Sequence, residues 1–223
     1  MSHPKFILAL DVEASGMGLR SNFLVQMGLA LISVELGEVV RRFSSYVRQP
    51  AGTTWEPRCV DEFWAKHPEA WERAKLALLT APEESVVRER LLEWLAGMPA
   101  GTRLVTDTPG YDVAWLDYLL YDRSHMYLFT GKESGKPEYN DVLDASSWCI
   151  GLAWKSDPDL SWKKCALRVA GDHDMTALPV FPGVEHDHDA ANDAAHTGLL
   201  VAWVMRQQET KHAANAYPLE FKE

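Results

Sequence analysis

A run of apolar residues that ends in two acids limits the fold of this chain more than any other feature. Residues 5–13, KFILALDVE, are continuously apolar up to Asp11, which is typical of a fully buried central strand. Side chains two positions apart in a strand share a face, so Asp11 and Glu13 are expected side by side. Burying two like charges is costly unless a cation neutralises them. The alternative is that the chain has already left the sheet and both carboxylates are solvated.

The rest of the chain predicts an α/β protein with a mixed sheet. Further strands are expected in three segments: 23–35, 38–50 and 102–107. Helices are expected in four segments: 58–78 with a break at Pro68, 82–98, 111–122, and from near Asp189 to about Gln208. Three other segments are expected to be an exposed loop (129–141), a strand that continues as a helix (141–154) and an irregular connection (155–183).

Composition predicts one globular domain in a reducing compartment. The 223 residues are 47% hydrophobic and carry a net charge of −10, which argues against a broad basic surface for duplex nucleic acid. The three cysteines form no CxxC pair, so neither a disulfide framework nor a cysteine zinc site is expected. The apolar run at the start is interrupted by Asp11 and is too short for a signal peptide core or a membrane span, so we expect a cytoplasmic protein without a membrane partner. We expect a single domain over 1–210 and a polar tail over 211–223.

A second acidic feature is Asp112, which is expected near the start of a helix, just after a strand and a Pro-Gly turn. An aspartate in that place stabilises the helix dipole without any catalytic role. Asp107 and Asp117, on either side of it, fit ordinary surface acids. Asp112 alone therefore leaves a structural and a catalytic role open.

The third feature is the stretch 184–200, VEHDHDAANDAAHTGLL, which brings histidines and acids to the start of the last helix. Asp187 or Asp189 suits a helix cap. Asp193 lies about one turn inside the helix among alanines, whose small side chains let another element approach closely. His188 precedes Asp193 by five residues, but a lone histidine is more often structural.

Taken together and in this order, the three features resemble the motifs of the DEDDh family of 3′–5′ exonucleases, the DnaQ-like branch of the RNase H-like fold. DVEASGM resembles the first motif, YDVAWL the second and HDAANDA the third, over residues from about 5 to 208. Residues 60–72, VDEFWAKHPEAWE, are similar to a segment of a smaller branch that includes a phage exodeoxyribonuclease and a mycobacterial exoribonuclease. One departure is Thr108, where many members of the family have asparagine four residues before the second-motif aspartate.

The resemblance implies an RNase H-like mixed five-stranded sheet flanked by helices, and phosphodiester hydrolysis with two Mg²⁺ or Mn²⁺ ions. Two hard cations with oxygen ligands can stabilise both the attacking and the leaving oxygen. By the resemblance, Asp11 bridges the two ions, Glu13 and Asp193 complete one of them, and Asp112 supports the other. His188 is implied to be the general base, a role that suits a side chain with a pKa near neutrality.

The resemblance also implies the substrate. The loop of Ala14, Ser15, Gly16 and Met17 is expected to hold the terminal nucleotide, with the amides of Ala14 and Ser15 near the sugar and Met17 as an apolar wedge. Trp64 is the tryptophan that best suits base stacking. The expected substrates are 3′ ends of single-stranded DNA or RNA, with DNA slightly favoured by the phage-like segment, and the products are nucleoside 5′-monophosphates. A homodimer is left open.

Two other interpretations compete with this one. A His/Asp metallohydrolase of another fold would use HDHDAA, which superficially resembles the His-x-His-x-Asp-His run of metallo-β-lactamase-type sites. Positions 190 and 191 are both alanine, however, and Asp11 and Glu13 stay unexplained. A catalytically inactive module that only binds nucleic acid is the second alternative. Such modules usually lose at least one acid, whereas all five positions are occupied here.

Overall fold

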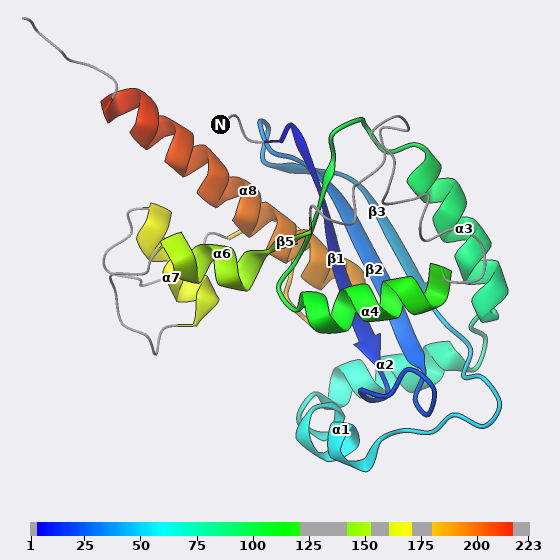
Figure 1. Cartoon of the computed structure of the whole chain (residues 1–223). Coiled ribbons are helices and arrows are strands. Elements are labelled where there is room, and N and C mark those ends of the chain that lie inside the picture. Colours follow the sequence, from blue (N-terminus) through cyan, green and yellow to red (C-terminus); the bar gives the residue numbers. More distant parts are fainter. Residues whose placement is uncertain (1–3, 121–141, 153–160, 171–179, 216–223) are drawn as a thin grey trace, which may run out of the picture.

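A mixed sheet of five strands forms the centre of the computed structural model, which describes residues 4–120, 142–152, 161–170 and 180–215 (Figure 1). The strands are β1 (Phe6–Ala14), β2 (Leu24–Ser33), β3 (Glu38–Tyr46), β4 (Arg103–Thr106) and β5 (Leu143–Asp144). They lie in the order β3-β2-β1-β4-β5. The pairs β1–β2 and β2–β3 are antiparallel, whereas β1–β4 and β4–β5 are parallel. The predicted mixed five-stranded sheet is confirmed, with β1 at its centre.

Helices cover both faces of this sheet. They are α1 (Pro57–Glu62), the 3₁₀ helix η1 (Trp64–Lys66), α2 (Pro68–Leu78), α3 (Glu84–Ala96), α4 (Pro109–Leu120), α6 (Ala145–Leu152), α7 (Trp162–Ala170) and α8 (Ala190–Asn215). Figure 1 shows α4 in front of the sheet and α8 behind it. Leu8 and Leu10 of β1 pack with α3 and α4, whereas Ile7 and Ala9 pack with α8. Because side chains alternate along a strand, Asp11 follows Ile7 and Ala9 onto the α8 face.

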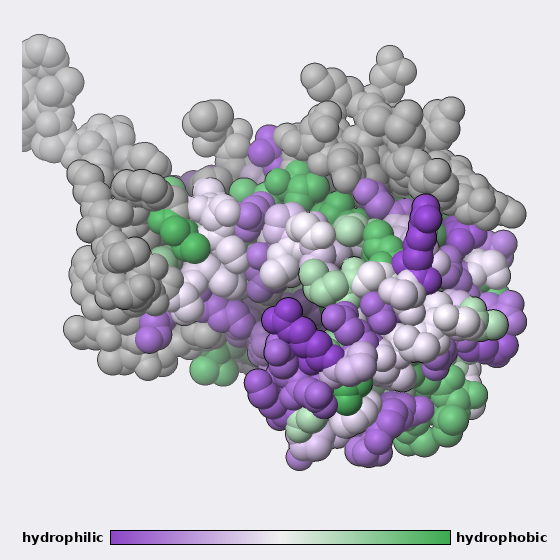
Figure 2. All heavy atoms as spheres, turned by 60° about the horizontal axis from the view of Figure 1, so that its bottom comes forward, coloured by the Kyte–Doolittle hydropathy of each residue, from purple (hydrophilic) through white to green (hydrophobic). Residues whose placement is uncertain are grey.

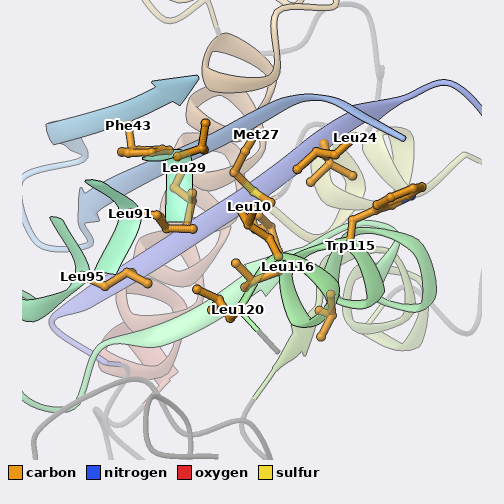
Figure 3. Close-up of a cluster of buried hydrophobic side chains, with 14 of the residues drawn as sticks. Leu10, Leu24, Met27, Leu29, Phe43, Leu91, Leu95, Trp115, Leu116 and Leu120 are labelled. Carbon is orange, nitrogen blue, oxygen red and sulfur yellow. The ribbon is translucent and has the colours of Figure 1, made fainter. Parts of the chain in front are cut away.

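The larger part of the core fills the space between the sheet, α3 and α4 (Figure 3). Leu10 and Met27 of the sheet lie opposite Leu116 of α4 in this view. Trp115 of α4 is fully buried. This apolar contact fixes α4 against the sheet, and with it the first helical turn that carries Asp112.

Three helices differ in detail from the prediction. The expected helix over 58–78 is divided into α1, η1 and α2, and Pro68 begins α2, which confirms the break at this proline. Helix α7 forms in a stretch predicted to be irregular, because its buried Cys165 packs against α8. Helix α8 runs past its expected end near Gln208 to Asn215, and so takes in the first residues of the expected tail. The predicted loop 129–141 and residues 216–223 lie outside the described residues.

None of the helices in the described part of the chain has both the length and the apolar character that crossing a membrane requires.

Gly28 of β2 allows the start of α8 to approach the sheet closely. A Cβ atom at this position would overlap the carbonyl group of Ala190 and the amide nitrogen of Ala191. Both are backbone atoms, so no side-chain rotation can relieve the overlap. The absence of a side chain at Gly28 therefore fixes the height at which α8, and Asp193 in its first turn, lies on the sheet.

Gly28→Ala should lower the free energy of unfolding by about 1–3 kcal/mol, the usual cost of overpacking a buried contact. Gly110→Ala is the matched control, because a Cβ atom there meets nothing within 4 Å and the residue lies in α4. Its stability should stay level or rise by up to ~1 kcal/mol from helix propensity. Urea denaturation of both variants measures the difference, and equal stabilities would contradict the close approach.

Candidate active site

The carboxylates that the sequence singles out come together where β1 ends. Asp11 and Glu13 belong to β1, Asp112 to the first turn of α4, and Asp193 to the first turn of α8. One oxygen each of Asp11, Glu13 and Asp193 lie within 4.8 Å of one another, and Asp11, Asp107 and Asp112 form a second such group. Asp11 belongs to both. Figure 2 looks at this end of the molecule, where hydrophilic side chains gather near the centre of the face.

Three of these carboxylates are buried, and Asp11 and Asp107 are half-buried. Asp112 is 1% exposed, Asp193 4% and Glu13 8%. Oδ2 of Asp11 is buried and accepts no hydrogen bond from the described part of the protein. A buried oxygen without a partner is unfavourable, so this atom fits a cation as its partner. Because every donor in both groups is a carboxylate oxygen, the groups fit hard divalent cations such as Mg²⁺ or Mn²⁺.

Burial raises the pKa of four of these acids, Asp11, Glu13, Asp112 and Asp193. For Asp11 and Glu13, burial and then repulsion from the neighbouring carboxylates raise the pKa well above its ordinary value. Burial raises the pKa of Asp112 and of Asp193 to about 7. Near neutral pH the cluster is therefore stable only when protons or cations neutralise part of its charge.

Two threonines orient Asp112. The hydroxyl groups of Thr106 and Thr108 both donate to its Oδ2 atom, the latter at 2.8 Å. Many members of the DEDDh family, which the sequence resembles, have asparagine at the position of Thr108. In this protein Thr108 holds the carboxylate of Asp112. Asp107 is a site residue that the sequence interpretation treated as an ordinary surface acid. Its position directly after β4 is the missed signal, since β4 runs parallel to β1 and ends at the same edge.

Two histidines, rather than one, lie beside Asp193. Nδ1 of His188 is 3.8 Å from Oδ2 of Asp193 and 4.0 Å from Oε1 of Glu13. Nε2 of His186, an exposed loop residue, is 3.7 Å from the same Asp193 oxygen. Burial, with smaller effects from His67 and His186, lowers the pKa of His188 from 6.5 to about 4. At neutral pH the His188 ring is therefore uncharged.

Helix α2 and the residues before it hold the histidine loop. Arg73 donates to the carbonyl oxygen of Asp187 at 2.8 Å and forms an ion pair of 3.6 Å with its carboxylate. The His188 ring packs against His67, with centroids 3.8 Å apart, and edge-on against Phe63 at 5.2 Å. His188 has φ +58°, in the left-handed region that side chains other than glycine adopt only with support from their surroundings.

Asp189 is the residue that caps α8. Its Oδ1 atom accepts hydrogen bonds from the amides of Ala191 and Asn192 at 3.1 and 3.3 Å. Of the two caps expected from the sequence, Asp189 is confirmed. Asp187 has another role, because its amide donates to Oδ1 of Asp193 at 3.0 Å. That bond leaves Oδ2 of Asp193 to face the two histidines.

The loop after β1 corrects one expected substrate contact. The amide of Ser15 donates to the carbonyl oxygen of Phe23 at 2.9 Å, so the prediction that it contacts the sugar is wrong. A Cβ atom at Gly16 would lie 2.5 Å from Oε2 of Glu56, the oxygen that accepts the amide of Met17 at 2.9 Å. Gly16 is therefore needed for the loop to close on Glu56.

Trp64 is also corrected. It is 1% exposed, so it offers no ring face on which a base could stack. Its Nε1 atom donates to the carbonyl oxygen of Ala14 at 3.3 Å, and Trp55 and Phe63 pack edge-on against its ring. Trp64 therefore fixes the end of β1 through the carbonyl group of Ala14. The amide of Ala14 is a different group, and its expected place near the sugar stays a prediction.

A cavity of about 410 Å³ adjoins the carboxylates. Its lining residues are Gly16, Met17, Glu56, Arg58, Cys59, Glu62, Phe63 and Tyr111. Phe63 also packs against His188, and Tyr111 directly precedes Asp112. Met17 is 71% exposed at this cavity. The volume falls in the range of small-molecule sites.

The raised acid pKa values predict how stability depends on pH when a chelator is present. Folded Asp112 titrates at about 7 instead of 3.8, so the folded state holds its proton more tightly and loses stability as the pH rises between these values. Asp112→Asn, which keeps a hydrogen-bonding side chain, should be more stable than the wild type at pH 8 by on the order of 1–4 kcal/mol.

The difference between the two proteins should vanish near pH 4. The pKa of His188 is lowered from 6.5 to about 4, so His188 makes the free energy of unfolding rise with pH between these values. Both proteins contain His188, so subtracting the stability curve of the wild type from that of Asp112→Asn removes this contribution. Chemical denaturation at a series of pH values in EDTA gives both curves. A pH-independent difference would contradict the raised pKa of Asp112.

Comparison with known proteins shows which solved structures have a similar fold. No protein-family model matches the chain, and no curated protein matches its sequence. The nuclease domain of 3′hExo, a DEDDh family member bound to rAMP, superposes with a TM-score of 0.59 at 14% identity, over 94% of each chain. E. coli exonuclease I in complex with a 5cy-dT13 oligonucleotide gives 0.61 at 15% identity, over 94% of this chain and 42% of that one.

S. pombe Pop2p, in a form that binds Mg²⁺ and Mn²⁺, gives a TM-score of 0.57 at 14% identity, over 92% of this chain and 84% of that one. Similarity at this level of identity concerns the fold alone. The chain has the α/β fold of the RNase H-like exonucleases.

Proposed function

We propose that this protein is a metal-dependent 3′–5′ exonuclease, which releases nucleoside 5′-monophosphates from the 3′ ends of single-stranded DNA or RNA. The observation that carries the proposal is that Asp11 belongs to two groups of carboxylates at once, with Glu13 and Asp193 in one and Asp107 and Asp112 in the other. Two adjacent cation positions that share one carboxylate suit phosphodiester hydrolysis.

Each carboxylate has a role in this proposal. Asp11, Glu13 and Asp193 would hold one Mg²⁺ or Mn²⁺ ion, and Asp11, Asp107 and Asp112 a second. The bound ions would supply the positive charge that stabilises the attacking and leaving oxygens of the phosphodiester. Thr108 keeps the Asp112 carboxylate in place through its hydrogen bond. The structure contributes Asp107 to this set in addition to the acids expected from the sequence.

His188 is the general base of the proposal. Its Nδ1 atom lies near carboxylates of both Glu13 and Asp193, whereas His186 reaches only Asp193. A base that accepts a proton from the attacking water must be uncharged, and the lowered pKa of His188 keeps it so at neutral pH. His186 therefore has no part in the proposed proton transfer.

The cavity beside the carboxylates is the proposed site of the 3′-terminal nucleotide. Met17 and the rings of Phe63 and Tyr111 offer apolar surface to a base. Glu56 and Glu62 also line the cavity, and Arg58 forms an ion pair of 2.9 Å with Glu62. With two carboxylates and one paired cation, the cavity favours a hydroxyl group at the end of the strand over a second phosphate.

The first test of the proposed function concerns metal dependence. Mg²⁺ or Mn²⁺ should raise the melting temperature of the wild type and support hydrolysis, because cations relieve the repulsion among buried carboxylates. Asp11→Asn should abolish hydrolysis and most of the thermal shift, since Asp11 serves both groups. The exposed Asp61→Asn controls for net charge and should behave like the wild type. Full activity in excess EDTA would disprove the metal mechanism.

A second prediction concerns polarity and substrate. 5′-labelled single-stranded DNA and RNA oligonucleotides should shorten one nucleotide at a time from the 3′ end, and a 3′-phosphate should block the reaction. Circular single strands should stay intact. Cleavage of circles would show an endonuclease, and tight binding of linear strands without cleavage would show an inactive binding module. The ratio of DNA to RNA turnover decides the preferred sugar.

A third prediction separates the two histidines. His188→Ala should lower the single-turnover rate by on the order of 10²–10⁴-fold, the usual contribution of a positioned general base. His186→Ala should lower it less than about tenfold. At saturating metal the wild-type rate should fall only as the pH approaches 4, because the pKa of His188 is lowered to about 4, and His188→Ala should lose this dependence. A larger loss in His186→Ala would reverse the assignment.

A further inference from the structure

His186, which the proposed hydrolysis does not use, completes a group of metal-ligand atoms with a composition unlike that of the carboxylate groups. One nitrogen each of His186 and His188 and one oxygen of Asp193 lie within 4.8 Å of one another. The two nitrogens are 3.7 and 3.8 Å from the same Asp193 oxygen. Two imidazoles and one carboxylate are a ligand set that zinc ions accept, with a fourth position left for water.

The spacing of these atoms is close to that of a real site. Bonds of about 2.0–2.1 Å in a tetrahedron place neighbouring ligand atoms about 3.3–3.4 Å apart. The two nitrogen–oxygen distances exceed this by only a few tenths of an ångström. The two nitrogens lie within 4.8 Å of each other, so the site closes when the two imidazole rings rotate towards each other.

The ligands are also held by their neighbours. Oδ1 of Asp193 accepts the amide of Asp187, which turns Oδ2 towards both rings. Arg73 binds the carbonyl oxygen and the carboxylate of Asp187, and so fixes the loop between the two histidines. Such supporting contacts typically change metal affinity by about 10–100-fold.

We infer that His186, His188 and Asp193 form an inhibitory site for a transition-metal ion such as Zn²⁺. The inhibition rests on the proposed function: an ion in this site occupies the imidazole that serves as general base and one carboxylate of the hydrolytic metal site. Mg²⁺ does not favour imidazole ligands, whereas Zn²⁺ and Co²⁺ do. The two classes of cation thus have opposite effects on one active site, and His186 makes the difference.

The binding experiment uses Co²⁺ as a spectroscopic probe on the chelator-stripped full chain, with excess Mg²⁺ to occupy the group of Asp11, Asp107 and Asp112, which does not include Asp193. The wild type should develop the intense visible absorption of four-coordinate Co²⁺ with nitrogen ligands. One equivalent of Zn²⁺ should displace the Co²⁺ and abolish this absorption. His186→Ala should weaken binding at least about tenfold. Glu185→Ala is the matched control, because Glu185 is the exposed neighbour of His186 and is not among the ligand atoms.

The inhibition experiment measures Mg²⁺-supported hydrolysis at increasing Zn²⁺. The wild type and Glu185→Ala should be inhibited at the same Zn²⁺ concentration, and His186→Ala should need at least about tenfold more. Equal Co²⁺ affinity, or equal Zn²⁺ inhibition, in the wild type and His186→Ala overturns the inference. A chain that binds Co²⁺ through His186 but hydrolyses nothing refutes the proposed function and the inhibition together, and leaves only the metal site standing.

Discussion

The repulsion among carboxylates that are buried at the end of β1 is the constraint on which the rest of the structure depends. Asp11, Glu13, Asp112 and Asp193 would each be more stable in water, and burial raises the pKa of all four. A cluster of this kind persists only where the surrounding fold holds it in place. Unfavourable local arrangements that the rest of the fold compensates are typical of functional sites. The packed sheet, with helices on both faces, provides that support, and cations or protons complete it.

Three elements hold the four acids: β1 carries Asp11 and Glu13, α4 carries Asp112, and α8 carries Asp193. β1 fixes Asp11 and Glu13 through strand pairing on both edges, while the core fixes the first turn of α4. Gly28 sets the distance between α8 and the sheet, and therefore the position of Asp193. The positions of these acids thus come from backbone contacts and close packing.

The sequence predicted those parts of the site that follow from local periodicity. The apolar run before Asp11 predicted a central strand, and alternation predicted that Asp11 and Glu13 share a face. The roles of Trp64, Ser15 and His186 could not be predicted, because each depends on a partner remote in sequence or on the exact path of a loop. Trp64 binds the carbonyl group of Ala14, and the Ser15 amide is taken by Phe23. Asp107 was within reach of prediction, since parallel strands end at one edge of a sheet.

The segment from α1 to α2 explains why the carboxylates alone do not make this site. The acids lie on rigid elements, but His188 lies on a loop with a left-handed backbone, which needs support from outside. That support comes from Phe63, His67 and Arg73, while Phe63 also lines the neighbouring cavity and Trp64 holds the end of β1. Phe63, Trp64 and His67 lie within the stretch VDEFWAKHPEAWE, and Arg73 directly follows it. None of the three acidic motifs includes this stretch. One segment thus joins the neighbouring cavity, the first strand and the histidine loop, so a change in how it packs moves the cavity wall and His188 together.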